Sequence, residues 1–210
     1  MITANYHYPI VHVGTLRNNE PGGSRRKFWV LGQDGQTEWL LKFPRLGTGE
    51  HWAEKVAAEI GPLIGVDCAR VELARWRNSL ATICLSFIPV PHDQLETYGL
   101  TDVAIGGARF DFLHGWEILE SVIDGYDASL RFNQVSHNIK NIVFAIRETT
   151  QVEGPNPFGL SDFVLRKLMS YTLLDGLIGN TDRHHENWML MYVREFGHSM
   201  ALPLPSFDHA

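Results

Sequence analysis

The spacing of apolar residues changes once along the chain, and this change constrains the fold more than any other feature of the sequence. Residues 9–14 and 27–43 carry short apolar runs typical of β-strands, and the stretch "GQDGQ" within the second range predicts a hairpin. After the proline-containing stretch "FIPVPHD", apolar residues recur mainly at helical spacing. The sequence therefore predicts an α+β fold in two parts, residues 1–88 rich in strands and residues 89–210 rich in helices.

Four segments have the spacing of amphipathic helices. The first, "TGEHWAEKVAAEIGPLIG", places Trp52, Val56, Ile60 and Leu63 along one stripe. The others are "GWEILESVIDG", "SHNIKNIVFAIRET" and "SDFVLRKLMSYTLLDGLIG". For the last of these, Ser161 or Asp162 is the expected N-cap, and Phe163, Leu165, Leu168, Met169, Leu173 and Leu177 form a broad apolar surface. Strands are expected in "CARVELARW" and "SLATICLSFI", and "WMLMYV" is expected to form a hairpin with the stretch that follows it.

Composition narrows the class of function. The charged fraction is 20%, and 24 acidic residues outnumber 18 basic ones, which gives a net charge of −6. This balance argues against a nucleic-acid-binding protein, because neutralising phosphates requires a concentrated basic surface. The N-terminus lacks the pattern of a secretory signal, and no apolar run has the length of a membrane span. A cytoplasmic protein that binds neither nucleic acid nor membrane is expected.

The stretch "IGNTDRHHENW" follows the longest predicted helix and carries most of the chemistry. It can be a solvated helix exit, a metal site or the catalytic loop of a phosphoryl-transfer enzyme. Adjacent histidines on a loop point apart, and no second Cys/His cluster with zinc-like spacing exists, so a histidine-based structural metal is disfavoured. A phosphoryl-transfer site requires a carboxylate near the attacking hydroxyl and oxygen ligands for Mg²⁺. Asp182, Asn187 and the later Asp208 supply such groups.

The first part of the chain contains residue types that bind nucleotide phosphates. Lys42 ends a predicted strand among apolar residues, and either Glu54 or Glu59 on the following helix can pair with it. Gly22 and Gly23 permit a tight turn whose backbone amides can cover phosphates. Occurring in this order in one chain, these features favour the catalytic-loop interpretation over a helix exit.

The stretches "LIGNTDRHHENW" and "LPSFDHA" resemble the catalytic and metal-binding motifs of HipA-like serine/threonine kinases, which belong to the protein-kinase-like and phosphatidylinositol-kinase-like superfamily. "GGSRRKFWVL", "WLLKFPR" and "GEHWAEKVAAEIGPLIGV" resemble the glycine loop, lysine strand and glutamate helix of that family. The resemblance runs from about Gly22 to Ala210. It implies a two-lobe kinase fold, with a nucleotide-binding lobe and a helical lobe that carries the catalytic and metal-binding loops.

The resemblance also implies roles for individual residues. Asp182 would be the catalytic base that orients the substrate hydroxyl, and Asn187 and Asp208 would hold Mg²⁺ on the phosphates of ATP. Lys42 would contact those phosphates, and family spacing selects Glu54 as the residue that steadies it. The remaining cofactor-binding residues would be the glycine loop with Gly22, Gly23 and Ser24, and the adenine-pairing hinge with Ser86, Phe87 and Ile88. His184 fits the D-R-H-x-x-N form of the lipid-kinase branch, as a loop-orienting or a chemical residue, and Arg183 and His185 receive no role.

HipA-like kinases continue beyond the position of Asp208 with a helical segment, whereas this sequence stops at Ala210. A helical lobe truncated at its C-terminus is therefore expected, and activity of the 210-residue chain is an open question. The resemblance further implies phosphorylation of Ser24, a toxin role, an antitoxin partner, and a protein substrate such as an aminoacyl-tRNA synthetase or another translation component. Two alternatives remain: a lipid or small-molecule kinase, and a nucleotide-binding pseudokinase module that does not catalyse transfer.

Overall fold

A computed structural model describes residues 9–13, 16, 26–32, 34–88, 103–105, 108–130, 133–150, 159–195 and 198–209. Within these residues the chain forms two compact units. The first contains residues 1–60 and 69–89, and the second contains residues 61–68 and 90–209. Gly22, Gly23 and Ser24 of the expected glycine loop lie outside the described residues, as do Pro89 and Pro91.

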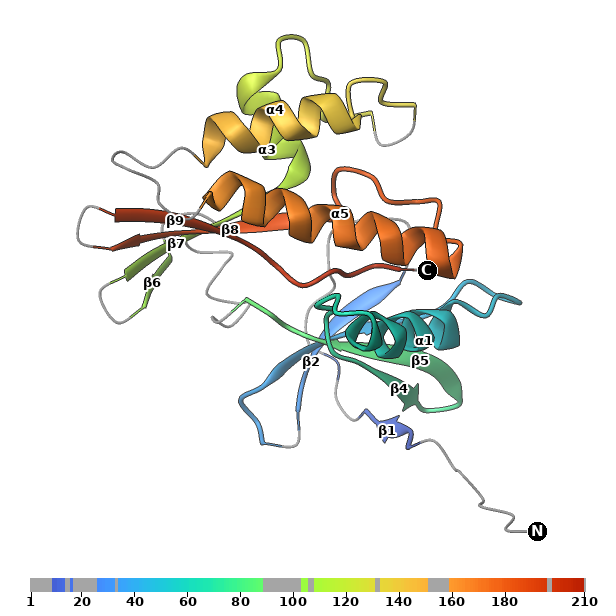
Figure 1. Cartoon of the computed structure of the whole chain (residues 1–210). Helices are drawn as coiled ribbons and strands as arrows, with labels where there is room; N and C mark the ends of the chain where they lie inside the picture. Colours follow the sequence, from blue (N-terminus) through green and yellow to red (C-terminus); the bar gives the residue numbers. More distant parts are fainter. Residues whose placement is uncertain are drawn as a thin grey trace. The chain divides into compact units, whose positions relative to one another are not determined.

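The first unit is a five-stranded mixed sheet with one helix (Figure 1). Its strands are β1 (Val11–His12), β2 (Lys27–Leu31), β3 (Glu38–Lys42), β4 (Val71–Trp76) and β5 (Ser79–Leu85), and its helix is α1 (Glu50–Leu63). The strand order is β1-β4-β5-β3-β2, in which β1 pairs with β4 in parallel and the other pairs are antiparallel. Because α1 crosses the unit boundary after Ile60, its last turn is counted with the second unit.

The hairpin between β2 and β3 forms where "GQDGQ" predicts it. Asp34 Oδ1 accepts hydrogen bonds from the backbone amides of Gln36 and Thr37, at 3.0 Å and 2.9 Å, and Gly35 has a φ of 70°. This turn chemistry reverses the chain and sets the register in which Phe28 faces Leu41. The core under the sheet consists of Val30, Leu41, Ala74, Ala81 and Ile83. The predicted hairpin and the strands after α1 are confirmed.

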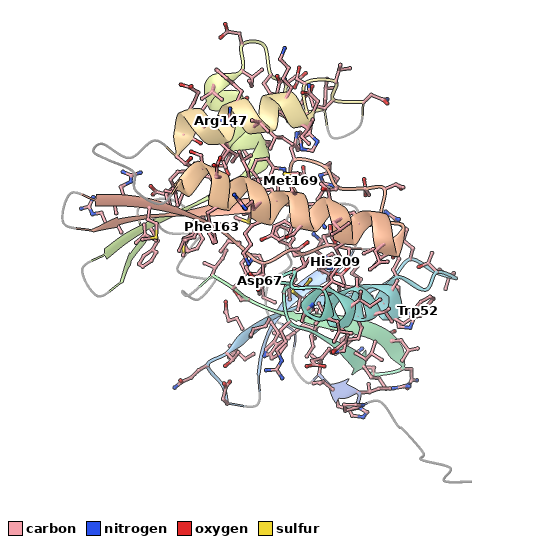
Figure 2. All side chains as sticks on the ribbon, in the orientation of Figure 1. Trp52, Asp67, Arg147, Phe163, Met169 and His209 are labelled. Carbon is pink, nitrogen blue, oxygen red and sulfur yellow. The ribbon has the colours of Figure 1, made fainter. Side chains whose placement is uncertain are left out.

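The predicted helix α1 forms, but its predicted apolar stripe does not face the core. Trp52 is 54% exposed, Val56 45% and Leu63 84%, and Trp52 is labelled in Figure 2. The buried face instead carries two charged residues, Glu54 and Lys55. The physical reason is that each charged side chain has a partner. Glu54 pairs with Lys42. Lys55 Nζ donates to Val71 O at 2.7 Å and to Glu72 Oε2 at 3.0 Å.

Within the described residues, the second unit contains three helices and a four-stranded antiparallel sheet with the order β6-β7-β8-β9. The strands are β6 (Val103–Ile105), β7 (Ala108–His114), β8 (Met189–Glu195) and β9 (His198–Pro203), and the helices are α3 (Gly115–Val122), α4 (Ile139–Thr149) and α5 (Leu160–Ile178). The expected β8–β9 hairpin is confirmed. Strands β6 and β7 were not anticipated, so the second part, which was predicted to be rich in helices, also contains a four-stranded sheet. The order of contacts is α3 on α4, α4 on α5 and α5 on β9, which Figure 1 shows within this unit.

Helix α5 begins earlier than its sequence suggests. Its N-cap is Gly159 in the left-handed conformation, with a φ of 56°, so Ser161 and Asp162 lie in the first turn and neither is the cap. Ser161 Oγ instead lies 2.8 Å from Thr150 Oγ1, at the C-cap of α4. The hydroxyl that suggested a cap is therefore used to join two helices.

The apolar surface predicted for α5 is divided between the core and solvent. Phe163, Met169, Leu173 and Leu177 are between 42% and 65% exposed. The buried face consists of Val164, Leu168, Tyr171, Leu174 and Asp175. None of the described helices is long and apolar enough to cross a membrane.

Candidate active site

In the first unit, Lys42 and Glu54 form a buried ion pair. Lys42 Nζ lies 3.4 Å from Glu54 Oε1, and the two residues are only 7% and 2% exposed. Lys42 is the last residue of β3, and the second turn of α1 presents Glu54 to it. Glu59, the other candidate partner, contacts Lys55 instead and its side chain is 59% exposed. Of the two glutamates that the sequence leaves open, the structure pairs Glu54 with the lysine.

A small cavity of about 10 Å³ lies beside this pair, lined by Lys42, Phe43, Pro44, Glu50, His51, Glu54 and Thr82. A buried lysine is stable only with a charged or hydrogen-bonding partner, because removing an ammonium from water is costly. The Lys42–Glu54 pair therefore holds a cation in place at the end of a strand, which is the arrangement that a phosphate-binding lysine needs.

The expected hinge residues Ser86, Phe87 and Ile88 follow directly after β5 in the same unit. The amide of Ser86 donates to Glu38 O at 3.0 Å, which continues the pairing of β3 with β5 by one residue. The hydroxyl of Ser86 accepts from the amide of Ile88 at 3.4 Å. This second bond is long and therefore weak, so an acceptor atom of a ligand can replace the Ser86 hydroxyl as the partner of the Ile88 amide.

In the second unit, the loop "NTDRHHENW" begins at the glycine that ends α5. Gly179 has a φ of 74°, and the amide of the following Asn180 donates to Asp175 O at 2.9 Å, as expected at a left-handed helix C-terminus. Asn180 Oδ1 then accepts from the amide of Asp182 at 3.0 Å. These bonds turn the chain sharply and leave the Asp182 side chain exposed.

Asn187 is 3% exposed, and its side chain is oriented by the same loop. Its Nδ2 donates to the backbone carbonyl of Asp182 at 2.8 Å. Since that bond uses the nitrogen end of the amide, the oxygen Oδ1 remains for another role. An amide oxygen fixed in this way is a suitable ligand for Mg²⁺, which prefers oxygen donors.

Arg183 connects this loop to the loop that carries Asp208. Its Nε and Nη2 donate to the two carboxylate oxygens of Asp175, at 2.8 Å and 2.7 Å. Nη1 donates to the carbonyls of Asn187 and Phe207, at 2.8 Å and 3.1 Å, and Nη2 also donates to Ser206 Oγ at 3.0 Å. One guanidinium therefore holds Asn187 and the residues just before Asp208 together.

The loop of Asp208 has further anchors within the second unit. The amide of Ser206 donates to Asp67 O at 2.8 Å, and His209 Nε2 lies 2.9 Å from Ser206 Oγ; Figure 2 labels Asp67 and His209. Asp208 itself has a φ of 55°, a left-handed conformation that is unusual for a residue other than glycine. Its neighbours on both sides are fixed, so the backbone at this carboxylate is held in an unfavourable conformation.

Two further side chains, Tyr126 and His137, contact residues of this loop. Tyr126 Oη lies 2.6 Å from His185 Nδ1, and Trp188 Nε1 donates to His137 Nε2 at 3.3 Å. Burial, followed by the nearby His185 and His184, lowers the pKa of His137 to about 4. Burial also raises the pKa of Tyr126 to about 12. Both groups therefore stay uncharged at neutral pH.

The residues of the second unit fit a magnesium ion shared with phosphates better than a metal held by protein alone. Among the described residues, no group of three His, Cys, Asp or Glu side chains is placed to hold a metal. Asn187 and Asp208 offer two oxygen-bearing side chains, and Mg²⁺ typically takes one or two protein ligands together with phosphate oxygens and water. The structure thus brings Asp182, Asn187 and the loop of Asp208 together, and it describes Lys42 and Glu54 in the other unit.

Sequence reasoning missed Arg183 and Asp175, which carry most of the polar contacts of the site. The sequence offered one signal: a carboxylate in the last turn of a helix lies at the negative end of the helix dipole and requires a cation, and Arg183 is the first cation after Asp175. His185 was also given no role, yet it is 1% exposed and lies against Tyr126 and His137.

Comparison with known proteins identifies the fold. No protein-family model matches the chain, and no curated protein matches it. Among solved structures, the Helicobacter pylori proinflammatory kinase CtkA is similar with a TM-score of 0.61 and 18% identity, over 96% of this chain and 60% of that chain. HipA of Shewanella oneidensis MR-1, solved with HipB and operator DNA, is similar with a TM-score of 0.57 and 13% identity, over 94% of this chain and 44% of that chain. The chain spans less than two thirds of either protein, and over that length it has the α+β fold of these kinases.

Proposed function

We propose that this chain is an ATP- and magnesium-dependent protein serine/threonine kinase of the HipA-like type. The observation that most supports the proposal is the polar cluster around Arg183, which holds Asn187 and the Asp208 loop together while Asp182 stays exposed beside them. A solvated helix exit would have no reason to bury an asparagine and an arginine network in this way.

Each residue has a distinct task in this proposal. Asp182 orients the acceptor hydroxyl and accepts its proton as the oxygen attacks the γ-phosphorus. A new P–O bond to the acceptor forms as the bond to the ADP oxygen breaks, so the products are a phosphoprotein and ADP. Lys42, held by Glu54, neutralises phosphate charge, and the backbone after β5 at Ser86, Phe87 and Ile88 pairs with adenine.

Asn187 and Asp208 would bind Mg²⁺, which when present neutralises charge on the phosphates. The protein's own contribution is positioning and electrostatics, with no covalent intermediate. The glycine loop with Gly22, Gly23 and Ser24 would cover the phosphates, and phosphorylation of Ser24 would regulate nucleotide binding. Residues 1–88 and 89–210 would then be the nucleotide-binding and catalytic parts.

The biological setting belongs to the proposal as well. HipA of Shewanella oneidensis is seen with HipB in a toxin–antitoxin system. By analogy, this chain would act in the cytoplasm as a toxin with an antitoxin partner, on a translation component such as an aminoacyl-tRNA synthetase. CtkA is a proinflammatory kinase, which shows that this fold serves more than one biological role.

The test is the variant Asp182→Asn, which keeps the size of the side chain and removes its charge. Transfer of labelled γ-phosphate from ATP to protein serine or threonine is expected to fall about 100- to 10,000-fold, the usual contribution of a positioned acid or base. Asp124→Asn, at an exposed position outside the loop, is the matched control and should transfer at the parent rate. ATP binding should persist in both variants.

Equal transfer by Asp182→Asn and the parent would contradict the assignment of the base. Binding of ATP by the parent with no transfer to any acceptor would identify a nucleotide-binding module without kinase activity. Transfer to phosphoinositides in preference to protein would identify a lipid kinase.

A further inference from the structure

A cleft of about 370 Å³ opens beside Asp182 within the second unit. One wall is the catalytic loop, and the other is the segment that precedes α4. The lining residues are Asn133, Gln134, Val135, His137, Thr181, Asp182, Arg183, His184 and His185. The proposed function uses Asp182 from one wall and assigns nothing to the other wall.

The second wall, which is the segment before α4, is held in place by hydrogen bonds to neighbouring residues. Gln134 Nε2 donates to Asp127 O at 2.6 Å, and Gln134 Oε1 accepts from the amide of Ser136 at 3.1 Å. Asn141 Nδ2, on α4, donates to Ser136 O at 2.9 Å. The segment is thus held from both sides, and Val135 at its tip is 85% exposed. An apolar side chain held at the edge of a polar cleft is a contact surface that needs no rearrangement before binding.

The wall is also joined to the catalytic loop. His137 Nε2 accepts the hydrogen bond from the indole of Trp188, which follows Asn187 directly. An imidazole that accepts at this nitrogen, and whose pKa is lowered to about 4, is neutral at physiological pH. This part of the cleft therefore presents no positive charge.

The charge of the cleft argues against a phosphorylated acceptor. Apart from its histidines, the charged lining groups are Asp182 and Arg183. All five N–H groups of Arg183 already donate, to Asp175, Asn187, Ser206 and Phe207. A phosphate on the acceptor would lack an available guanidinium and would meet the Asp182 carboxylate. An uncharged hydroxyl group avoids both costs.

We propose that this cleft is the acceptor site and that it binds an uncharged, hydroxyl-bearing polypeptide segment. This inference rests on the proposed function. Val135 contacts the side chain next to the acceptor residue and selects an apolar one there. Val135 is therefore a specificity-determining residue, and it takes no part in binding ATP or magnesium.

The experiment measures binding, so that it does not depend on turnover. Immobilised peptides with a central serine carry leucine, glutamate or lysine at the flanking positions. They are exposed to the labelled chain with Mg²⁺ and a non-hydrolysable ATP analogue. The parent should prefer leucine-flanked peptides about fivefold, the value expected for partial burial of one aliphatic side chain. Vesicles containing phosphatidylinositol 4-phosphate provide the anionic alternative and should bind more weakly than the leucine-flanked peptides.

Variants at the tip of the wall then test Val135 itself. Val135→Ser should remove the preference for leucine, and Val135→Lys should shift it to glutamate by about twofold to fivefold, as expected for one exposed ion pair. Leu173→Ser, at a position on α5 that is 65% exposed and outside the cleft, is the matched control and should keep the parent preference.

Flanking preferences that are the same in the parent and both Val135 variants would overturn the inference, and so would tighter binding to the anionic vesicles than to any peptide. Neither binding result by itself overturns the proposed function, which is decided by the transfer of phosphate to protein and by its loss in Asp182→Asn. Conversely, a chain that shows the predicted peptide preference but transfers no phosphate would overturn the proposed function and leave the binding preference of the cleft established.

Discussion

Arg183 is the residue on which the geometry of the candidate site most depends. Its guanidinium joins the end of α5, the loop of residues 180–188 and the loop of Asp208 through five hydrogen bonds, all between 2.7 Å and 3.1 Å. Asp175, its ion-pair partner, is 5% exposed. A planar group with five donors can make these bonds simultaneously, whereas a lysine ammonium has three donors at one point.

The variant Arg183→Lys should therefore keep the charge and lose the connection between the two loops. We expect the unfolding free energy to fall by about 1–3 kcal/mol, because hydrogen bonds to charged groups are lost. We also expect the Mg²⁺ concentration for half-maximal phosphate transfer to rise about tenfold, because a loss of about 1.4 kcal/mol in the positioning of Asn187 and Asp208 corresponds to that factor. Urea denaturation and a magnesium titration measure the two effects.

Arg147→Lys, at an exposed position on α4 that Figure 2 labels, serves as the control and should change neither quantity. A loss of stability in Arg183→Lys with an unchanged magnesium requirement would mean that Arg183 supports the fold alone and does not position the metal ligands.

At the scale of elements, the start of α3 is packed closely against the loop of residues 180–188. The amide of Gly115 donates to Trp188 O at 3.0 Å, and the amide of Trp116 donates to His185 O at 3.2 Å. A Cβ on Gly115 would lie 2.1 Å from the indole ring of Trp188. A glycine is therefore required at this position by the close approach of a helix and an aromatic ring.

Two glycine variants should accordingly change stability in opposite directions. Gly115→Ala should lower the unfolding free energy by about 1–3 kcal/mol, because the ring of Trp188 must move. Gly176→Ala, within α5 and with no atom within 4 Å of the added Cβ, should raise it by about 0.5–1 kcal/mol, because alanine favours the helix. Thermal or urea unfolding of both proteins measures the difference. Stabilisation by Gly115→Ala would show that Trp188 does not fill this space.

The elements that the sequence predicts well are those with a local signal. The β2–β3 hairpin has its turn residues, α4 and α5 have their apolar spacing, and β8 and β9 are joined by a short connection. Strand β7 lacked such a signal because its partner β8 follows only after α5. The buried face of α1 was predicted wrongly. The residues buried there are charged and paired with partners, and the spacing of apolar residues carries no information about such pairs.

At the scale of the whole molecule, the proposed function requires both units to respond to one ligand. The first unit carries Lys42 and Glu54, and the second carries Asp182, Asn187 and Asp208. These residues were predicted as site residues from their types and their order along the chain. The sequence could not predict the contacts of Arg183, because strands β8 and β9 separate Ser206 and Phe207 from Arg183 along the chain.

Amide hydrogen exchange tests this requirement. Magnesium and ATP together should slow exchange in β3 and α1 of the first unit and in the 180–188 and 204–209 segments of the second. At a ligand concentration of 100 times Kd, the stabilisation is about 2.7 kcal/mol, so amides that exchange through global unfolding should slow about 100-fold.

Asp208→Asn should lose the magnesium-dependent part of this protection in both units, while its exchange without ligand should be no faster than that of the parent. Protection confined to the first unit would show that the nucleotide is bound there alone, and the proposed roles of Asn187 and Asp208 would then be wrong.

The left-handed backbone at Asp208 carries one more consequence. A carboxylate residue in this conformation costs about 1 kcal/mol relative to glycine, and asparagine tolerates the conformation more readily than most residues. Selection for folding alone would thus drive this position toward glycine or asparagine. An aspartate there makes the native state less stable than the same backbone would be with glycine, and the proposed function gives this destabilisation a reason, because a metal-binding carboxylate is needed at that position.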